Sequence, residues 1–122
     1  MNETAIRVMA EYGVARGSRL VHISTDYVFD GSGEQPFREA SDASPLGVYG
    51  QSKLAGEEAI RATLRQHLIL RTAWVFGASG GNFVKTMLRL AETRSQVAVV
   101  GDQFGAPTSA RAIAKAIAFL IL

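Results

Sequence analysis

Apolar runs that alternate with helix-like segments constrain the fold of this chain more than any other feature of its sequence. One run, at residues 20–23, ends in Ser24 and Thr25, and a second, at residues 67–76, is apolar almost throughout. Such a run is typical of a parallel strand that is covered on both faces. The order of segments, helix and strand in alternation with short connections, predicts an α/β fold with a parallel sheet.

The bounds of the predicted elements follow from apolar spacing and from turn residues. Strands are predicted at residues 19–24, 67–76 and 96–100, and helices at about residues 4–13, 46–66, 82–93 and 110–122. Asn82 is the predicted N-cap of the third helix, and Thr108 or Ser109 that of the fourth. Residues 30–45 are predicted to form a long surface loop, and loops of that length in compact domains are usually functional. The 122 residues are expected to form a single domain.

A hydroxyl and a carboxylate, Thr25 and Asp26, leave the first predicted strand together. Open α/β sheets bind their ligands outside the carboxyl ends of the strands. Farther along, Tyr49 and Lys53 are four residues apart, so on a helix they share one face. A phenol titrates near ~10, and a nearby cation favours its ionised form. Thr25, Tyr49 and Lys53 together could polarise a carbonyl and protonate its oxygen as a hydride arrives.

Six blocks of the sequence carry a more specific signal. In chain order they are STDYVFDG (24–31), SPLGVYG (44–50), KLAGE (53–57), LRTAWVF (70–76), NF (82–83) and DQFGAPT (102–108). In kind and order they resemble the dTDP-4-dehydrorhamnose reductase family, in the extended branch of the short-chain dehydrogenase/reductases. The resemblance implies the second half of a Rossmann-like doubly wound sheet, strands 4, 5 and 6 of the order 3-2-1-4-5-6 with flanking helices. The family's amino-terminal cofactor-binding third and much of its carboxyl-terminal lobe have no counterpart in these blocks.

The family's chemistry, carried over by resemblance, is the reduction of a nucleotide-sugar ketone to dTDP-rhamnose with NADPH or NADH. It implies that Tyr49 supplies the proton, that Thr25 orients the ketone, and that Lys53 supports the phenol. Tyr49 and Lys53 are also the implied cofactor contacts, with Lys53 reaching the nicotinamide ribose. Thr25, Asp26 and Trp74 are the implied substrate contacts, and the implied setting is the cytoplasm.

Each of these residues has a purely structural alternative. Thr25 or Asp26 could cap the turn that follows the strand, and Trp74 could be a core residue. Arg71 could bind a substrate diphosphate, or it could equally pair with an acidic side chain of the fold. Asn82 could cap its helix and contact substrate as well. His22, inside an apolar strand, is expected to be a satisfied core or sheet-end residue.

A glycine-rich turn at residues 77–81 offers a competing cofactor site. It follows a strand and opens a helix, which is where a dinucleotide-binding glycine fingerprint belongs. Phe83 occupies the position of the third glycine and would obstruct close packing of helix on strand. The simpler interpretation is a strand-to-helix turn without a phosphate.

Composition excludes several classes of protein. The net charge of +2 is small and its basic residues are scattered, which argues against nucleic-acid binding. The chain has no cysteine, and its two histidines, His22 and His67, do not have zinc-ligand spacing, so no metal site is predicted. No apolar run approaches the ~20 residues of a membrane span, and the first residues lack a signal-peptide pattern.

Two expectations concern what the chain does as a whole. A bare strand edge at residues 20–23 would favour association, so a homo-oligomer is expected. Because the family's cofactor-binding third has no counterpart here, the alternative function is a non-catalytic structural, binding or regulatory module of the same family.

Overall fold

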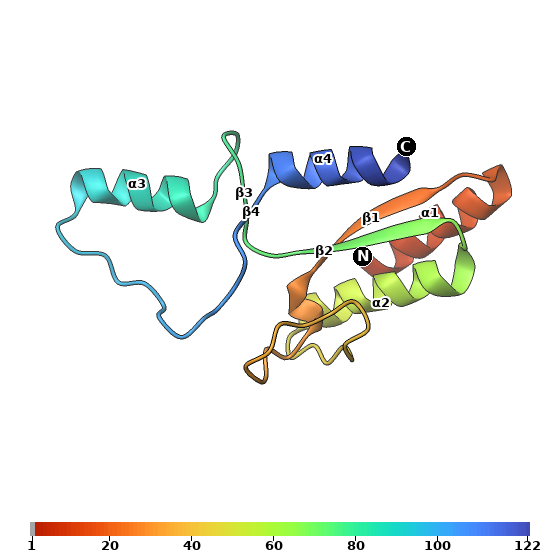
Figure 1. Ribbon diagram of the computed structural model, residues 1–122, viewed down its shortest axis with the longest axis horizontal. Coiled ribbons are helices and arrows are strands. Elements are labelled where there is room, and N and C mark those ends of the chain that lie inside the picture. The colour runs from red at the N-terminus through yellow and green to blue at the C-terminus, as the bar shows by residue number, and fades with distance from the viewer. Residues whose placement is uncertain (1) are drawn as a thin grey trace. The chain divides into compact units, whose positions relative to one another are not determined.

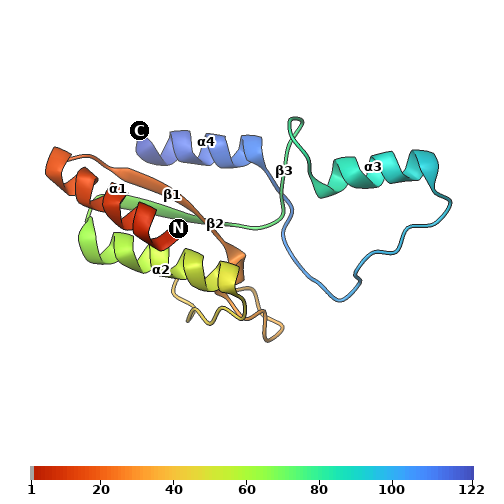
Figure 2. The same ribbon diagram turned by 180° about the vertical axis from the view of Figure 1, so that it is seen from behind.

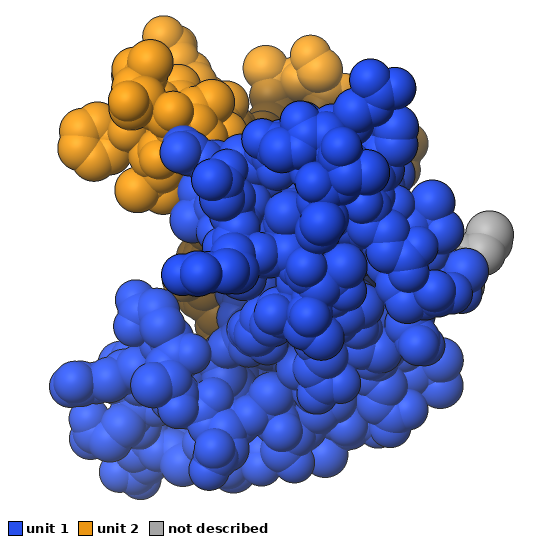
Figure 3. Space-filling model, turned by 90° about the vertical axis from the view of Figure 1, so that its right-hand side faces the viewer, with its two compact units in different colours: residues 1–72 blue, residues 73–122 orange. Residues whose placement is uncertain are grey.

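The computed structural model describes residues 2–122 and shows a mixed α/β chain with two small parallel sheets (Figures 1 and 2). The chain divides into two compact units, one ending at Thr72 and the other running from Ala73 to Leu122, which are coloured separately in Figure 3. The predicted α/β class with parallel strand pairing is therefore confirmed. The three predicted strands, however, do not form one sheet.

The first unit contains two helices and two long strands, in the order α1 (Asn2–Arg16), β1 (Leu20–Thr25), α2 (Val48–Thr63) and β2 (His67–Thr72). A single turn of 3-10 helix, η1 (Asp26–Val28), follows β1. Strands β1 and β2 are parallel, in a register that runs from Leu20 opposite His67 to Thr25 opposite Thr72. Both strands therefore end side by side, which places the side chains that follow them at one edge of the sheet.

The core of this unit lies where α2 packs against α1 and η1. Its fully buried apolar side chains come from all three elements: Ala10, Val28 and Ile60, with Leu64 just after α2. Helix α1 approaches Leu64 so closely that a Cβ at Gly13 would lie 3.0 Å from a methyl carbon of that leucine. Glycine at this position lets the two helices pack side by side.

Helix α1 ends in a Schellman motif. Gly17 has φ +61°, and the amides of Ser18 and Gly17 donate to the carbonyls of Gly13 (2.9 Å) and Val14 (3.2 Å). The left-handed conformation suits glycine and satisfies carbonyls at the helix end. The motif turns the chain into β1, and α1 is longer than predicted at both ends.

The second unit contains the shorter strands. Its elements are β3 (Val75–Phe76), α3 (Phe83–Thr93), β4 (Thr108–Ser109) and α4 (Ala110–Ile121), and β3 pairs with β4 in parallel. Asn82 caps α3 by accepting a hydrogen bond from the Lys85 amide, and Ser109 caps α4 by accepting from the Ala112 amide. Both predicted caps are confirmed, with Ser109 rather than Thr108 as the second.

Two strand predictions need correction. The strand predicted at residues 67–76 is broken, because Trp74 has a left-handed backbone with φ +44°, which ends β2 at Thr72 and starts β3 at Val75. The strand predicted at residues 96–100 is wrong: this segment is irregular and exposed, and β4, which was not predicted, pairs with β3. Apolar residues such as Val97 and Val99 favour a strand, but a strand forms only beside a partner.

Candidate active site

Thr25 and Asp26 lie where β1 runs into η1, at the carboxyl end of the sheet. Thr25 is buried and caps η1, because its Oγ1 accepts a hydrogen bond from the Tyr27 amide at 3.2 Å. The same hydroxyl donates to Oδ1 of Asp26, also at 3.2 Å. The capping alternative is thus correct for Thr25 and not for Asp26. The hydroxyl and the carboxylate lie together at the sheet end, as the pattern predicted, and the structure adds a hydrogen bond between them.

Tyr49 and Lys53 lie on α2, one helical turn apart, as predicted. Tyr49 is about half exposed, and its ring meets that of Tyr27 edge to face, with centroids 6.0 Å apart and planes at 74°. The first turn of α2 sits directly against η1, because a Cβ at Gly50 would lie only 2.1 Å from the Tyr27 carbonyl oxygen. Gly50 therefore permits the close approach that places Tyr49 beside the end of β1.

Lys53 reaches back from α2 to strand β1. Its Nζ donates a hydrogen bond to the carbonyl of Ile23 at 2.7 Å and lies 3.3 Å from Nε2 of His22. Partial burial lowers the pKa of Lys53, and the carboxylate of Glu57, one turn farther along α2, opposes that effect. The side chain is therefore held against the strand by polar contacts and is not a solvated helix residue.

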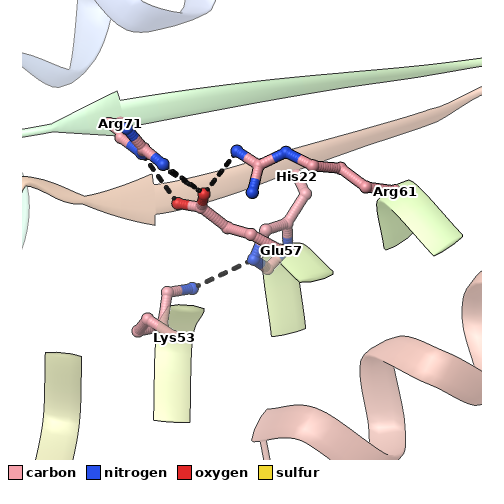
Figure 4. A network of polar contacts seen from close by, with 5 residues as sticks. All are labelled: His22, Lys53, Glu57, Arg61 and Arg71. Carbon is pink, nitrogen blue, oxygen red and sulfur yellow. Dashed lines mark hydrogen bonds and ion pairs between the residues drawn. The ribbon is translucent and has the colours of Figure 1, made fainter. Parts of the chain in front are cut away.

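Glu57 is the centre of a buried charge network (Figure 4). It is 0% exposed, and its carboxylate accepts from Arg71 on β2, with Nη2 at 2.7 Å and Nε at 3.0 Å, and from Nη2 of Arg61 at 2.8 Å. Burial by itself would raise the pKa of Glu57, but hydrogen bonding from Arg71 and Ser24, together with the charges of Arg71 and Arg61, outweighs burial and lowers it. The carboxylate is held ionised and links helix α2 to strand β2.

The network decides between the two interpretations of Arg71. Its guanidinium is committed to Glu57 and also lies over the ring of Phe29, 4.9 Å from the centroid. Phe29 in turn stacks on Phe37 of the long loop, with centroids 4.3 Å apart. Arg71 therefore pairs with an acid of the fold, which was the structural alternative, and helps to anchor the loop predicted at residues 30–45.

Trp74 belongs to the second unit. Its left-handed backbone lies between β2 and β3, its carbonyl accepts from the Thr108 amide at 3.3 Å, and its side chain is 45% exposed. The indole packs on Gly105, where a Cβ would lie 2.5 Å from ring carbon Cε2. The ring is therefore neither a core residue nor free, because one face rests on the irregular segment before β4.

The glycine-rich turn at residues 77–81 directs main-chain carbonyls toward a lysine. Lys85 Nζ donates to the carbonyls of Ala78 and Gly80, each at 3.0 Å, and Asn82 Nδ2 donates to the carbonyl of Gly77 at 2.8 Å. A phosphate cradle needs amide groups rather than carbonyls around the anion. The arrangement favours the interpretation of this segment as a turn.

Sequence reasoning missed the roles of two residues. The sequence pattern assigns no role to Glu57 and predicts for His22 only a satisfied core or sheet-end position. One signal in the sequence could have revealed the pair of Glu57 with Arg71. Both are charged residues at positions where the pattern predicts buried apolar side chains, and buried charges are usually paired. Among residues 2–122, no cluster of acids and histidines could hold a metal ion, and no helix is long and apolar enough to cross a membrane.

Comparison with known proteins identifies the family. A family model described as the RmlD substrate binding domain matches residues 1–122. This chain belongs to that family. Among its relatives is the dTDP-4-dehydrorhamnose reductase of Escherichia coli K12, which is 47% identical to this chain over 121 residues. The aligned residues cover 99% of this chain and 40% of the relative. The spore coat polysaccharide biosynthesis protein SpsK of Bacillus subtilis is 52% identical over 101 residues, 83% of this chain and 36% of the relative.

A solved RmlD-family structure supports the fold. The dTDP-4-dehydrorhamnose reductase of Bacillus anthracis in complex with NADP aligns with a TM-score of 0.95 at 40% identity, covering 99% of this chain and 43% of that one. The chain therefore spans well under half the length of these relatives. Its fold is that of the corresponding portion of a Rossmann-type reductase.

Proposed function

We propose that this chain carries the ketone-reducing residues of a dTDP-4-dehydrorhamnose reductase. The reaction is the conversion of dTDP-4-dehydro-6-deoxy-L-hexose to dTDP-L-rhamnose with NADPH or NADH. Support comes from membership of the RmlD family and from relatives that carry this name. Support from geometry comes from one observation above all: Lys53 Nζ is held by the carbonyl of Ile23, at the end of β1, one turn from Tyr49.

The contacts of Lys53 fit a nicotinamide cofactor. An ammonium group has three N–H donors, and the contacts to Ile23 and His22 use two of them. The third donor is available for a ribose hydroxyl, which is the role implied for Lys53. When bound, the cofactor supplies the hydride.

The residues of this chain then have distinct tasks. Tyr49, about half exposed beside η1, donates its proton to the ketone oxygen as negative charge develops there. Thr25 orients the ketone by a hydrogen bond, and Lys53 stabilises the phenolate that Tyr49 leaves behind. Asp26 contacts sugar hydroxyls next to Thr25, and Trp74 offers the exposed part of its indole to the substrate.

Three further features belong to the same proposal. Strands β1 and β2 extend a doubly wound sheet in the complete fold of the family, beside the strands that bind cofactor. The protein acts on its nucleotide sugar in the cytoplasm. The 122-residue chain by itself forms a homodimer through the outer edge of β1, because among residues 2–122 β1 pairs only with β2.

A chimera tests the catalytic assignment. Residues 1–122 replace the matching segment of the Bacillus anthracis reductase, and oxidation of NADPH is followed with the dTDP-4-dehydro sugar as substrate. The expected result is turnover that falls about 10²–10⁴-fold in Tyr49→Phe. The same change at Tyr12, an exposed tyrosine of α1, is the matched control and should leave turnover unchanged. A folded, NADP-binding chimera without activity would contradict the proposal.

A further inference from the structure

His22 lies on strand β1 with its imidazole beside the ammonium group of Lys53 (Figure 4). The two contacts of Nζ, to His22 Nε2 at 3.3 Å and to the carbonyl of Ile23 at 2.7 Å, come from adjacent residues of the strand. We propose that His22 is a positioning residue: its neutral imidazole accepts a hydrogen bond from Lys53 and, with the Ile23 carbonyl, holds the ammonium at the end of β1. The catalytic meaning of this contact rests on the function proposed above.

The chemistry of the contact determines the form of the imidazole. A lysine ammonium can only donate, so the nitrogen that faces it must carry a lone pair. Nε2 of His22 is therefore unprotonated, and the ring proton is on Nδ1. A doubly protonated imidazolium could not make this contact, because both of its nitrogens are donors.

Charged groups around His22 act in opposite directions. Burial lowers the pKa of His22, the cation of Lys53 lowers it further, and Glu57 raises it. On β2, Arg71 pairs with Glu57, and Arg61 of α2 shares the same carboxylate. Among the described residues of α1 and η1, no charge shifts His22. The neutral form that the contact needs is therefore the form that the surroundings favour.

Acidification should release the lysine. When His22 gains a proton, the strand loses one acceptor for Lys53 and presents a cation 3.3 Å from the ammonium. Lys53 then keeps only the Ile23 carbonyl, and its ammonium moves away from the imidazole. A histidine that served only to fill the core would titrate without any change at Lys53.

Nuclear magnetic resonance on the labelled 122-residue chain tests this inference without cofactor or substrate. Ring nitrogen correlations should give the Nδ1–H tautomer for His22, with a midpoint below the ordinary ~6.5. The Cε and Nζ resonances of Lys53 should follow the same midpoint. Lys85 and Lys115, which lie in the second unit, are internal controls and should show no inflection there.

Two substitutions separate positioning from packing. Lys53→Gln removes the charge but keeps a donor, and it should raise the midpoint of His22, because the Lys53 cation lowers the pKa of that imidazole. His22→Gln places a neutral amide oxygen near the position of Nε2, and it should abolish the inflection at Lys53. Amide spectra establish that both variants are folded.

The inference is overturned if His22 carries its proton on Nε2, or if Lys53→Gln leaves the midpoint of His22 unchanged. Activity of the chimera is a separate matter. A tautomer and coupled titration as described, in an inactive chimera, would contradict the proposed reduction and leave the positioning contact established.

Discussion

Arg71 places two nitrogens of its guanidinium on the carboxylate of Glu57, with Nη2 at 2.7 Å and Nε at 3.0 Å from its two oxygens. The pair joins strand β2 to helix α2, and α2 is the helix that carries Tyr49 and Lys53. Because Glu57 is fully buried, removing its charge would leave a cation without a partner at the edge of the core.

Glu57→Gln should therefore be strongly destabilising. The expected loss in the free energy of unfolding is about 3 kcal/mol, the range found when one partner of a buried ion pair is removed. Urea unfolding followed by circular dichroism measures it. The control is Glu11→Gln, which removes an exposed i,i+4 pair with Arg7 and should cost no more than about 0.5 kcal/mol. Equal losses in both variants would contradict the role of the network.

The same carboxylate should make stability depend on pH. Since the pKa of Glu57 is lowered on folding, the unfolded chain binds more protons in the acid range. The contribution of Glu57 is complete above the ordinary glutamate value of ~4.3 and is lost as pH falls through its folded pKa. Unfolding midpoints measured between neutral and acidic pH should fall less steeply in Glu57→Gln than in the wild type.

Gly50→Ala tests the close approach of α2 to η1. The new Cβ would lie 2.1 Å from the Tyr27 carbonyl oxygen and 2.9 Å from Pro45 Cβ, so helix and turn must separate. A loss of about 1–3 kcal/mol is expected, together with reduced turnover in the chimera, because Tyr49 is the neighbouring residue. Gly81→Ala, where a Cβ meets nothing within 4 Å, is the control. An unfolding curve for Gly50→Ala that matches that of Gly81→Ala would refute the constraint.

Thr25→Val should slow the chimera less than Tyr49→Phe does. In the reaction proposed above, the hydroxyl orients the ketone through one hydrogen bond, whereas the phenol transfers the proton. Thr25 also caps η1, so valine should lower stability by about 1 kcal/mol as well. Kinetics and thermal unfolding of the two variants, measured together, separate these effects. A larger kinetic loss for Thr25→Val would reverse the assigned roles.

The chain alone should bind NADPH weakly, with a Kd in the millimolar range, worth about −4 kcal/mol. The reason is that residues 77–81 direct the carbonyls of Ala78 and Gly80 toward Lys85, and carbonyl groups do not bind the phosphates of a cofactor. Titration with the cofactor while nicotinamide fluorescence is followed measures the affinity, and the chimera is the positive control. Micromolar binding by the chain alone would restore this turn as a phosphate site.

Light scattering should detect a homodimer at tens of micromolar. Pairing of β1 edges would give a continuous sheet and bury more than about 1,000 Å². Ile23→Lys adds a charge to an exposed position of the same strand and should shift the equilibrium toward monomer. A wild-type chain that remains monomeric, with cooperative unfolding, would show that the edge does not drive association.

The sequence was most informative where local rules act alone. The existence and approximate position of β1 and α2, to within one to three residues at their ends, and the cap of Asn82 follow from apolar spacing and cap chemistry. The break at Trp74 could not be predicted, because a left-handed conformation is unusual for a bulky residue and leaves no mark in an apolar pattern. The segment at residues 96–100 has strand propensity, but whether a partner lies beside it is a property of the fold and not of those residues.

In the candidate site, too, local features were predictable from the sequence and contacts between distant residues were not. Thr25, Asp26, Tyr49 and Lys53 were recognisable because their chemical types stand at the positions where ligand sites occur. The partner of Lys53 was not recognisable, since His22 lies 31 positions away and only the packing of α2 on β1 brings the two together. Arg71 was open to two interpretations until Glu57 was found buried opposite it.

The hydroxyl of Thr25 has a single hydrogen, and in this structure Asp26 holds it. In the proposed reaction, a ketone can accept that hydrogen only if Thr25 no longer donates it to Asp26, so binding of the carbonyl would free a carboxylate oxygen of Asp26. In that proposal, the freed oxygen becomes a hydrogen-bond acceptor for the hydroxyls of the sugar substrate. Selectivity for a polyhydroxylated ketone over a simple one would follow from this shared hydrogen, without any additional contact.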